Sequence, residues 1–252
     1  MLATLAVTTL GAFWNPSIRV NGRNLNIRGR GPPVVFSPGL YGSVTSRMYS
    51  KLLSGLTDDF SVMTLDGVGI LRREDVEAIA NAIGAETVGL LTHSSFDYSS
   101  LQSSRVARAA LLDPNALPEL DGFWSLRPRR IVADVPTLIV MSEHAYEGES
   151  PFIIDHFSAN IEGPCVSEEK RHDVGHCDIL DDTWADFGDR LGIKGYRATT
   201  ESSTKPFSEW TFTSPRRASS DRRKVRSDYR GAMTERLKTF FSPSSPIVTV
   251  ET

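Results

Sequence analysis

The chain is poor in cysteine, with only Cys165 and Cys177 among its 252 residues. The two residues form no Cys-x-x-Cys pair and fit no zinc-binding spacing, so the sequence predicts neither a disulfide framework nor a structural metal site. We expect no cofactor and no bound metal. Cys177 stands beside His176, and we interpret its thiol as a buried neighbour of that histidine instead of a nucleophile.

Two further absences narrow the class of protein. No apolar run approaches the ~18 residues that a membrane span needs, and the formal net charge is only −3. The sequence therefore predicts no membrane-spanning helix and gives no general reason to expect nucleic acid as a partner. Its 40% hydrophobic and 23% charged residues are typical of a globular protein, and the length suits one α/β domain.

The first thirteen residues are uncharged and mostly apolar, and two interpretations fit them. Their β-branched content favours a first strand or an unstructured start. Their small residues, and an Ala12-Phe13 step like those cleaved in plastid leaders, fit a targeting segment, although no positive charge precedes it. We therefore divide the chain into a leader or first strand at 1–17 and one domain at 18–252, located in the cytoplasm or a plastid.

Strand and helix patterns alternate along this domain. Residues 18–27 predict a hairpin around Asn21-Gly22, the strongest short hairpin signal. Further strands are predicted at 34–37, 61–65, 87–93, 106–112 and 135–141, and helices at 48–56, 74–83, 95–102 and 226–241. Alternation of this kind predicts the α/β class, with a doubly wound, mostly parallel sheet and helices on both faces.

The most informative stretch is an apolar run from Thr87 that leads directly into Ser94. Some hydrolases hold a nucleophilic serine this way, at a sharp turn between a buried strand and a helix. The usual pattern is Gly-x-Ser-x-Gly, whereas Thr92 and Phe96 stand at the glycine positions here. A serine that merely caps the helix at 95–102 is the alternative interpretation.

Two further side chains complete a candidate catalytic set. Asp113 follows the strand at 106–112, and His176 lies on a later loop. The order Ser94, Asp113, His176 is the one α/β-hydrolases use, and each residue follows a predicted strand, at the ligand-binding end of such sheets. His93 directly precedes the serine, and we expect it to pack instead of reacting.

An oxyanion hole would need two backbone N–H donors near Ser94. In the α/β-hydrolase arrangement one comes from the residue after the nucleophile and one from an earlier loop, which here gives Ser95 and Leu40. A plain β-turn over Ser37–Gly42 is the alternative interpretation of that loop.

Several segments resemble a known group of enzymes. Residues 34–40 resemble the oxyanion-loop region of platelet-activating-factor acetylhydrolases, with Pro38 where those enzymes have histidine. Residues 111–114 resemble the catalytic-acid segment of those enzymes and of plant chlorophyllases. Residues 175–182 resemble the chlorophyllase segment around the catalytic histidine. The similarity continues in patches from about Val20 to Phe241, and the chain is identified as a member of this esterase group of the α/β-hydrolase superfamily.

The resemblance implies a carboxylic-ester hydrolase that forms an acyl-enzyme on Ser94, with His176 as base and Asp113 as orienting acid, acting on a lipid-like or pigment ester. Glu143 is the alternative acid, since many α/β-hydrolases carry theirs after the next strand. A catalytically inactive protein that binds a ligand or partner is the competing hypothesis, because Phe96 should crowd the turn. In an active enzyme we expect the Phe96 ring to line an acyl pocket.

The C-terminal part changes character, with a polar, basic insertion at about 196–225. Residues 195–252 hold eleven Lys and Arg against six Asp and Glu. The clusters Arg216-Arg217 and Arg222-Arg223-Lys224 could contact anionic lipid head groups, although we favour a solvated loop. The partner that we expect is a small-molecule ester.

Overall fold

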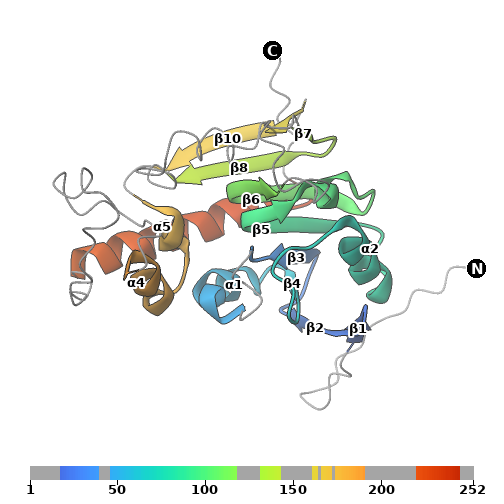
Figure 1. Cartoon of the computed structure of the whole chain (residues 1–252), viewed down its shortest axis with the longest axis horizontal. Helices are drawn as coiled ribbons and strands as arrows, with labels where there is room; N and C mark the ends of the chain where they lie inside the picture. Colours follow the sequence, from blue (N-terminus) through green and yellow to red (C-terminus); the bar gives the residue numbers. More distant parts are fainter. Residues whose placement is uncertain are drawn as a thin grey trace, which may run out of the picture.

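A computed structural model describes residues 18–39, 46–117, 131–142, 161–163, 166–171, 174–190 and 220–244. Its main feature is an eight-stranded sheet that runs from β1 at the bottom of Figure 1 to β10 at the top. The strands, in spatial order, are β1 (Ile18–Val20), β2 (Arg23–Arg28), β4 (Ser61–Leu65), β3 (Pro33–Ser37), β5 (Val88–Asp97), β6 (Val106–Leu117), β8 (Thr137–Ser142) and β10 (Val166–Arg171).

All neighbouring pairs from β4 to β10 are parallel, and only β1 and β2 at one edge run antiparallel to their neighbours. The predicted α/β class with a mostly parallel, doubly wound sheet is therefore confirmed. The hairpin prediction is also confirmed. Asn21 and Gly22 join β1 to β2 with φ values of 51° and 78°, as a two-residue turn of this kind requires.

Helices cover both faces of the sheet (Figure 1). They are α1 (Ser50–Leu56), α2 (Arg73–Ala82), α4 (Asp182–Arg190) and α5 (Ser220–Phe241), with short 3₁₀ turns η2 (Ser46–Tyr49), η3 (Tyr98–Gln102) and η4 (His176–Ile179). None of the helices in the described ranges is long and apolar enough to cross a membrane.

Alternating strand side chains divide the core into two clusters. Leu91 and Leu112 pack with α1, α4 and α5 on one face, whereas Leu90 and Leu111 pack with α2 on the other. Helix α5 lies so close to β5 that a Cβ on Gly89 would come within 2.8 Å of a carbon of the Phe241 ring. The central strands and the C-terminal helix therefore form one packed unit.

The helix predicted at 95–102 is present only in its second part, as the 3₁₀ turn η3 at Tyr98–Gln102, and the prediction is wrong for residues 95–97. Strand β5 continues to Asp97 and pairs with β6 as far as Leu117, so only the turn η3 follows it. The physical reason is Phe96, whose fully buried side chain lies in the core cluster on the α2 face. Keeping the strand ladder buries this ring and also satisfies the backbone, which outweighs the short polar helix suggested by the local sequence.

The structure also contains elements that the sequence patterns did not predict. Strands β7 (Ile131–Val132) and β9 (Ile161–Glu162) form a small parallel sheet of their own, and β10, η4 and α4 follow later in the chain. The segment 1–17 and most of the predicted insertion at 196–225 lie outside the described residues.

Candidate active site

The pairing of β5 and β6 breaks at two predicted site residues. His93 pairs with Leu112 and Ser95 pairs with Asn115, so Ser94 stands in the break on one strand and Asp113 on the other. Both have positive φ, 63° for Ser94 and 43° for Asp113. Left-handed backbone is uncommon outside glycine and costs energy, and such residues cluster at functional sites. Ser94 thus has the strained backbone expected of a nucleophile, but at a strand bulge instead of a strand-to-helix turn.

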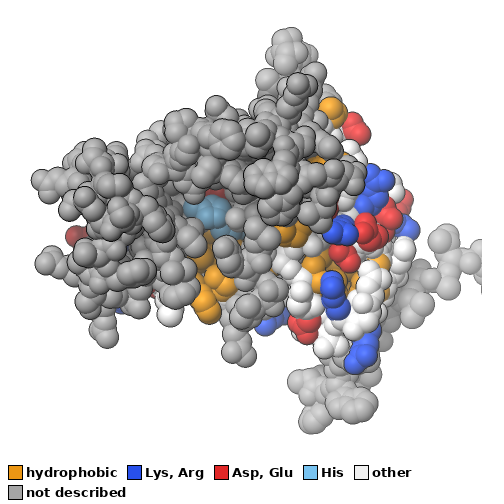
Figure 2. All heavy atoms as spheres, in the orientation of Figure 1, with side chains coloured by type: hydrophobic (Ala, Val, Ile, Leu, Met, Phe, Trp, Pro, Cys, Tyr) orange, Lys and Arg blue, Asp and Glu red, His pale blue; other side chains and the backbone are white. Residues whose placement is uncertain are grey.

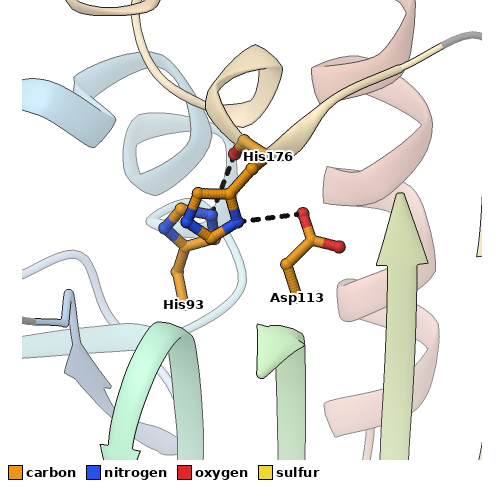
Figure 3. Close-up of side chains that lie close together, drawn as sticks. All are labelled: His93, Asp113 and His176. Atoms are coloured by element: carbon orange, nitrogen blue, oxygen red, sulfur yellow. Dashed lines mark hydrogen bonds and ion pairs between the residues drawn. The ribbon is translucent and has the colours of Figure 1, made fainter. Parts of the chain in front are cut away.

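Asp113 lies against His176, the first residue of η4 (Figure 3). The Nδ1 atom of His176 is 3.5 Å from Oδ2 of Asp113. This distance exceeds an ordinary N–H···O hydrogen bond. The Asp113 side chain is buried, whereas 15% of the His176 side chain stays exposed, and Figure 2 shows histidine atoms at the surface of this face.

Ser142, the last residue of β8, fixes the carboxylate of Asp113. Its backbone N–H donates to Oδ1 at 2.5 Å, and its hydroxyl donates to Oδ2 at 2.8 Å. Burial alone would raise the pKa of Asp113, but the interactions with His176, His93 and the Ser142 N–H outweigh it, and the pKa falls below its ordinary value. Asp113 is therefore an ionised, oriented acceptor beneath His176.

His93 packs against the ring of His176. Its ring stacks on the His176 ring, with centroids 4.5 Å apart and an interplanar angle of 22°. Its Nδ1 is 2.7 Å from the Tyr49 hydroxyl, and its Nε2 is 3.1 Å from the backbone oxygen of His176. Burial, and then the neighbouring His176, lower the pKa of His93 to about 3. His93 is packed as expected, and it is neutral at physiological pH.

This neutral histidine makes stability depend on pH. The ordinary pKa of 6.5 applies to the unfolded chain and a pKa of about 3 to the folded one, so between these values the unfolded state binds more protons. We expect the free energy of unfolding to fall by up to about 1.4 kcal/mol per pH unit as the pH decreases through this window. Urea unfolding from pH 7 to pH 4 should show a shallower loss in His93→Gln, and equal slopes would contradict the prediction.

The other site predictions fare differently. Within the described ranges the Ser94 hydroxyl donates no hydrogen bond, while Ser95 continues the strand opposite Asn115. The oxyanion donor Leu40 and the alternative acid Glu143 lie outside the described residues. The expectation that Phe96 lines an acyl pocket is wrong, because its ring is completely enclosed in the core on the α2 face.

Two side chains that contact the candidate site residues, Tyr49 and Ser142, were not predicted from the sequence. Tyr49 lies in the first turn of the helix predicted at 48–56, and no local pattern connects it with His93, 44 residues further on. Ser142 had a usable signal, because it ends a parallel strand on the ligand-binding edge of the sheet. Only the fold reveals that Tyr49 contacts His93 and that Ser142 contacts Asp113.

Among the described residues, one group of side chains could hold a metal ion. His93, Asp113 and His176 offer ligand atoms within 4.8 Å of one another. However, both nitrogens of His93 contact Tyr49 or the His176 carbonyl, and both oxygens of Asp113 accept from Ser142. The side chains of His93 and Asp113 are therefore already engaged in hydrogen bonds within the protein.

The basic cluster at 222–224 lies on the first turns of α5. Arg222 reaches within 3.9 Å of Asp178, and Arg223 within 4.0 Å of Asp186, so both arginines face carboxylates of their own chain. Lys224 is exposed. Arg216 and Arg217 lie outside the described residues, and contact with anionic lipid stays a prediction.

No protein-family model matches the chain, and no curated protein matches it either. Among solved structures, it is similar to an epoxide hydrolase of Bacillus megaterium bound to an inhibitor, with a TM-score of 0.45 and 14% identity over 70% of this chain and 97% of that one. An α/β fold family hydrolase from Bacillus anthracis aligns with a TM-score of 0.45 and 12% identity, over 66% and 94% of the two chains. A carboxylesterase from Bacillus subtilis gives 0.44 and 15%, over 64% and 84%. At such identities, the activity of this chain must be argued from its own residues.

Proposed function

We propose that this protein is a serine hydrolase of carboxylic esters, with Ser94 as nucleophile, His176 as general base and Asp113 as orienting acid. The observation that carries the proposal is the contact between His176 and buried, ionised Asp113, beside a serine in left-handed backbone. A buried carboxylate and two strained residues are costly to a fold. Their convergence on one histidine therefore favours a catalytic purpose.

The chemistry follows from these positions. Ser94 Oγ attacks the ester carbonyl carbon and gives its proton to Nε2 of His176, while Asp113 accepts the Nδ1–H and stabilises the imidazolium. The tetrahedral intermediate then releases the alcohol, which takes the proton back from His176, and an acyl group remains on Ser94. Water repeats the sequence and releases the acid. We assign the oxyanion contacts to the backbone N–H groups of Leu40 and Ser95.

The proposed substrate is a lipid-like or pigment ester. This assignment rests on the resemblance of residues 175–182 to the histidine segment of chlorophyllases, and of residues 34–40 to the acetylhydrolase loop. Partial exposure of His176 at the surface is compatible with an ester that approaches from outside.

An inactive protein that binds a ligand or partner is the second candidate, favoured by two observations. Strand β5 continues to Asp97, so no helix N-terminus stands behind Ser94 to aim N–H groups at an oxyanion. In the part of the chain that the structure describes, the Ser94 hydroxyl also makes no hydrogen bond with His176. Binding without turnover would explain both features.

A fluorophosphonate probe and a series of p-nitrophenyl esters of increasing acyl length distinguish the two candidates. We expect covalent labelling at Ser94 and ester turnover in the wild type, neither in Ser94→Ala, and both in Ser54→Ala, a control at an exposed serine on α1. A correctly folded wild type that neither reacts with the probe nor hydrolyses any ester in the series would establish the binding protein instead.

A further inference from the structure

Tyr49 and His93 connect three parts of the candidate site. Tyr49 ends η2, His93 immediately precedes Ser94, and the His93 ring lies between the Tyr49 hydroxyl and His176. We propose that Tyr49 and His93 are positioning residues that hold the His176 imidazole in place for proton transfer with Ser94. This inference rests on the proposed function and assigns that reaction two residues outside the triad.

The positions of the hydrogens on Tyr49 and His93 follow from the groups that these side chains contact. The backbone oxygen of His176 can only accept, so the Nε2 of His93, 3.1 Å away, must carry a hydrogen. A neutral ring has one such hydrogen, which makes Nδ1 the acceptor for the Tyr49 hydroxyl at 2.7 Å. Burial raises the pKa of Tyr49 well above its ordinary value, so the phenol keeps its proton. The single hydrogen of the Tyr49 hydroxyl therefore lies between two acceptors, Nδ1 of His93 and the Pro38 oxygen at 2.9 Å, while Nε2 of His93 donates to the His176 backbone.

Two kinds of contact restrain His176. The hydrogen bond from Nε2 of His93 holds its backbone, and the stacked His93 ring covers one face of its imidazole. Asp113 approaches the edge of the same imidazole at Nδ1, as Figure 3 shows. Together these contacts limit rotation of the imidazole and fix which nitrogen points away from Asp113, towards the reacting groups.

The same pair also links the base to the nucleophile and to the proposed oxyanion loop. Because His93 and Ser94 are consecutive, holding His93 against His176 sets the separation between the nucleophile's backbone and the base. The Tyr49 hydroxyl lies 2.9 Å from the Pro38 oxygen, two residues before Leu40. Tyr49 is almost fully enclosed, and its ring packs edge-on against Phe36 and His93, so it is a rigid support.

Three substitutions test separately the ring stacking and the hydrogen bonds of His93 and Tyr49. His93→Phe keeps a ring for stacking but removes both hydrogen bonds, whereas His93→Gln can still donate to His176 and accept from Tyr49 without stacking. Tyr49→Phe removes one hydroxyl. Thr92→Val is the matched control, because Thr92 is equally buried on the same strand and its hydroxyl has no hydrogen-bond partner among the described residues.

The measurements are kcat and KM for p-nitrophenyl acetate, with kcat expressed per serine labelled by the fluorophosphonate probe, and kcat/KM from pH 5 to pH 9. We expect kcat to fall roughly 10²-fold in His93→Phe, as for a small misplacement of a catalytic group, with KM nearly unchanged. Tyr49→Phe should lose up to about tenfold, the net worth of one hydrogen bond. His93→Gln should recover part of the loss, and the acid limb of the pH profile should move in His93→Phe.

Each outcome has a distinct meaning. A purely structural role would lower the labelled fraction and the melting temperature but leave kcat per labelled serine and the pH profile unchanged, and this result would overturn the inference alone. A wild type without labelling or turnover would overturn the proposed function and this inference with it. Unchanged kinetics are expected for Thr92→Val, and a matching loss there would show that any change in this strand disturbs the site.

Discussion

Asp113→Asn should lower kcat for ester hydrolysis by roughly 10⁴-fold, the scale seen when the orienting acid of a serine triad becomes an amide. The carboxylate accepts from Ser142 through both oxygens and faces Nδ1 of His176. An amide nitrogen in the position of Oδ2 would donate to Nδ1 and drive the hydrogen of the imidazole to Nε2. His176 could then no longer take the proton of Ser94.

The substitution should leave the fold intact. The amide oxygen can still accept the backbone N–H of Ser142, and the Ser142 hydroxyl can turn to accept from the amide nitrogen. Steady-state kinetics and thermal unfolding therefore need to be measured together. Asp59→Asn is the control, the same chemical change at a surface carboxylate paired with Lys238. A loss below about tenfold in Asp113→Asn would contradict its assignment as the acid and favour Glu143.

Local patterns in the sequence predict much of the fold. The Asn21-Gly22 turn requires two residues with positive φ, and few sequences satisfy it, so the hairpin is confirmed. Strand β3 is equally clear, since its apolar residues are enclosed on both faces of the sheet. The approach of Asp113 to His176 agrees with an expectation based on chain order and strand ends, although their roles stay proposals.

The features of the fold and of the candidate site that the sequence did not predict depend on contacts between distant residues. A polar stretch after Ser94 has helical character, but pairing with β6 and burial of Phe96 keep it extended. Tyr49 and His93 meet only because η2 and α1 pack on the face of the sheet to which His93 points. Arg226 is the clearest case, since nothing in the sequence around it predicts burial, yet its side chain is fully buried.

Arg226 is the centre of an ionic network that joins α5 to the segment carrying His176. Its Nε donates to Asp178 at 2.7 Å, and its Nη1 donates to Asp186 at 2.5 Å. The other oxygen of Asp178 accepts the N–H of Gly175 at 2.8 Å, directly before His176. The long helix therefore holds the start of η4 through one buried carboxylate, which is 1% exposed.

Arg226→Met should destabilise the protein by about 3–5 kcal/mol, because it leaves the buried charge of Asp178 without its main partner. For a chain of this size that corresponds to a melting temperature lower by roughly 6–20 °C. Lys224→Met is the matched control, since it removes the same charge from an exposed position on the same helix. Its effect should stay within about 0.5 kcal/mol.

The double variant Arg226→Met/Asp178→Asn tests the cause. Asparagine keeps an oxygen for the Gly175 N–H but carries no charge, so it should restore a large part of the stability lost in Arg226→Met. If the loss came only from missing packing of the arginine side chain, the second substitution would not restore it. Denaturant unfolding of the four proteins in this cycle gives the coupling energy between Arg226 and Asp178. A value near zero would mean that the network does not anchor the His176 segment, and that α5 is held by its apolar face alone.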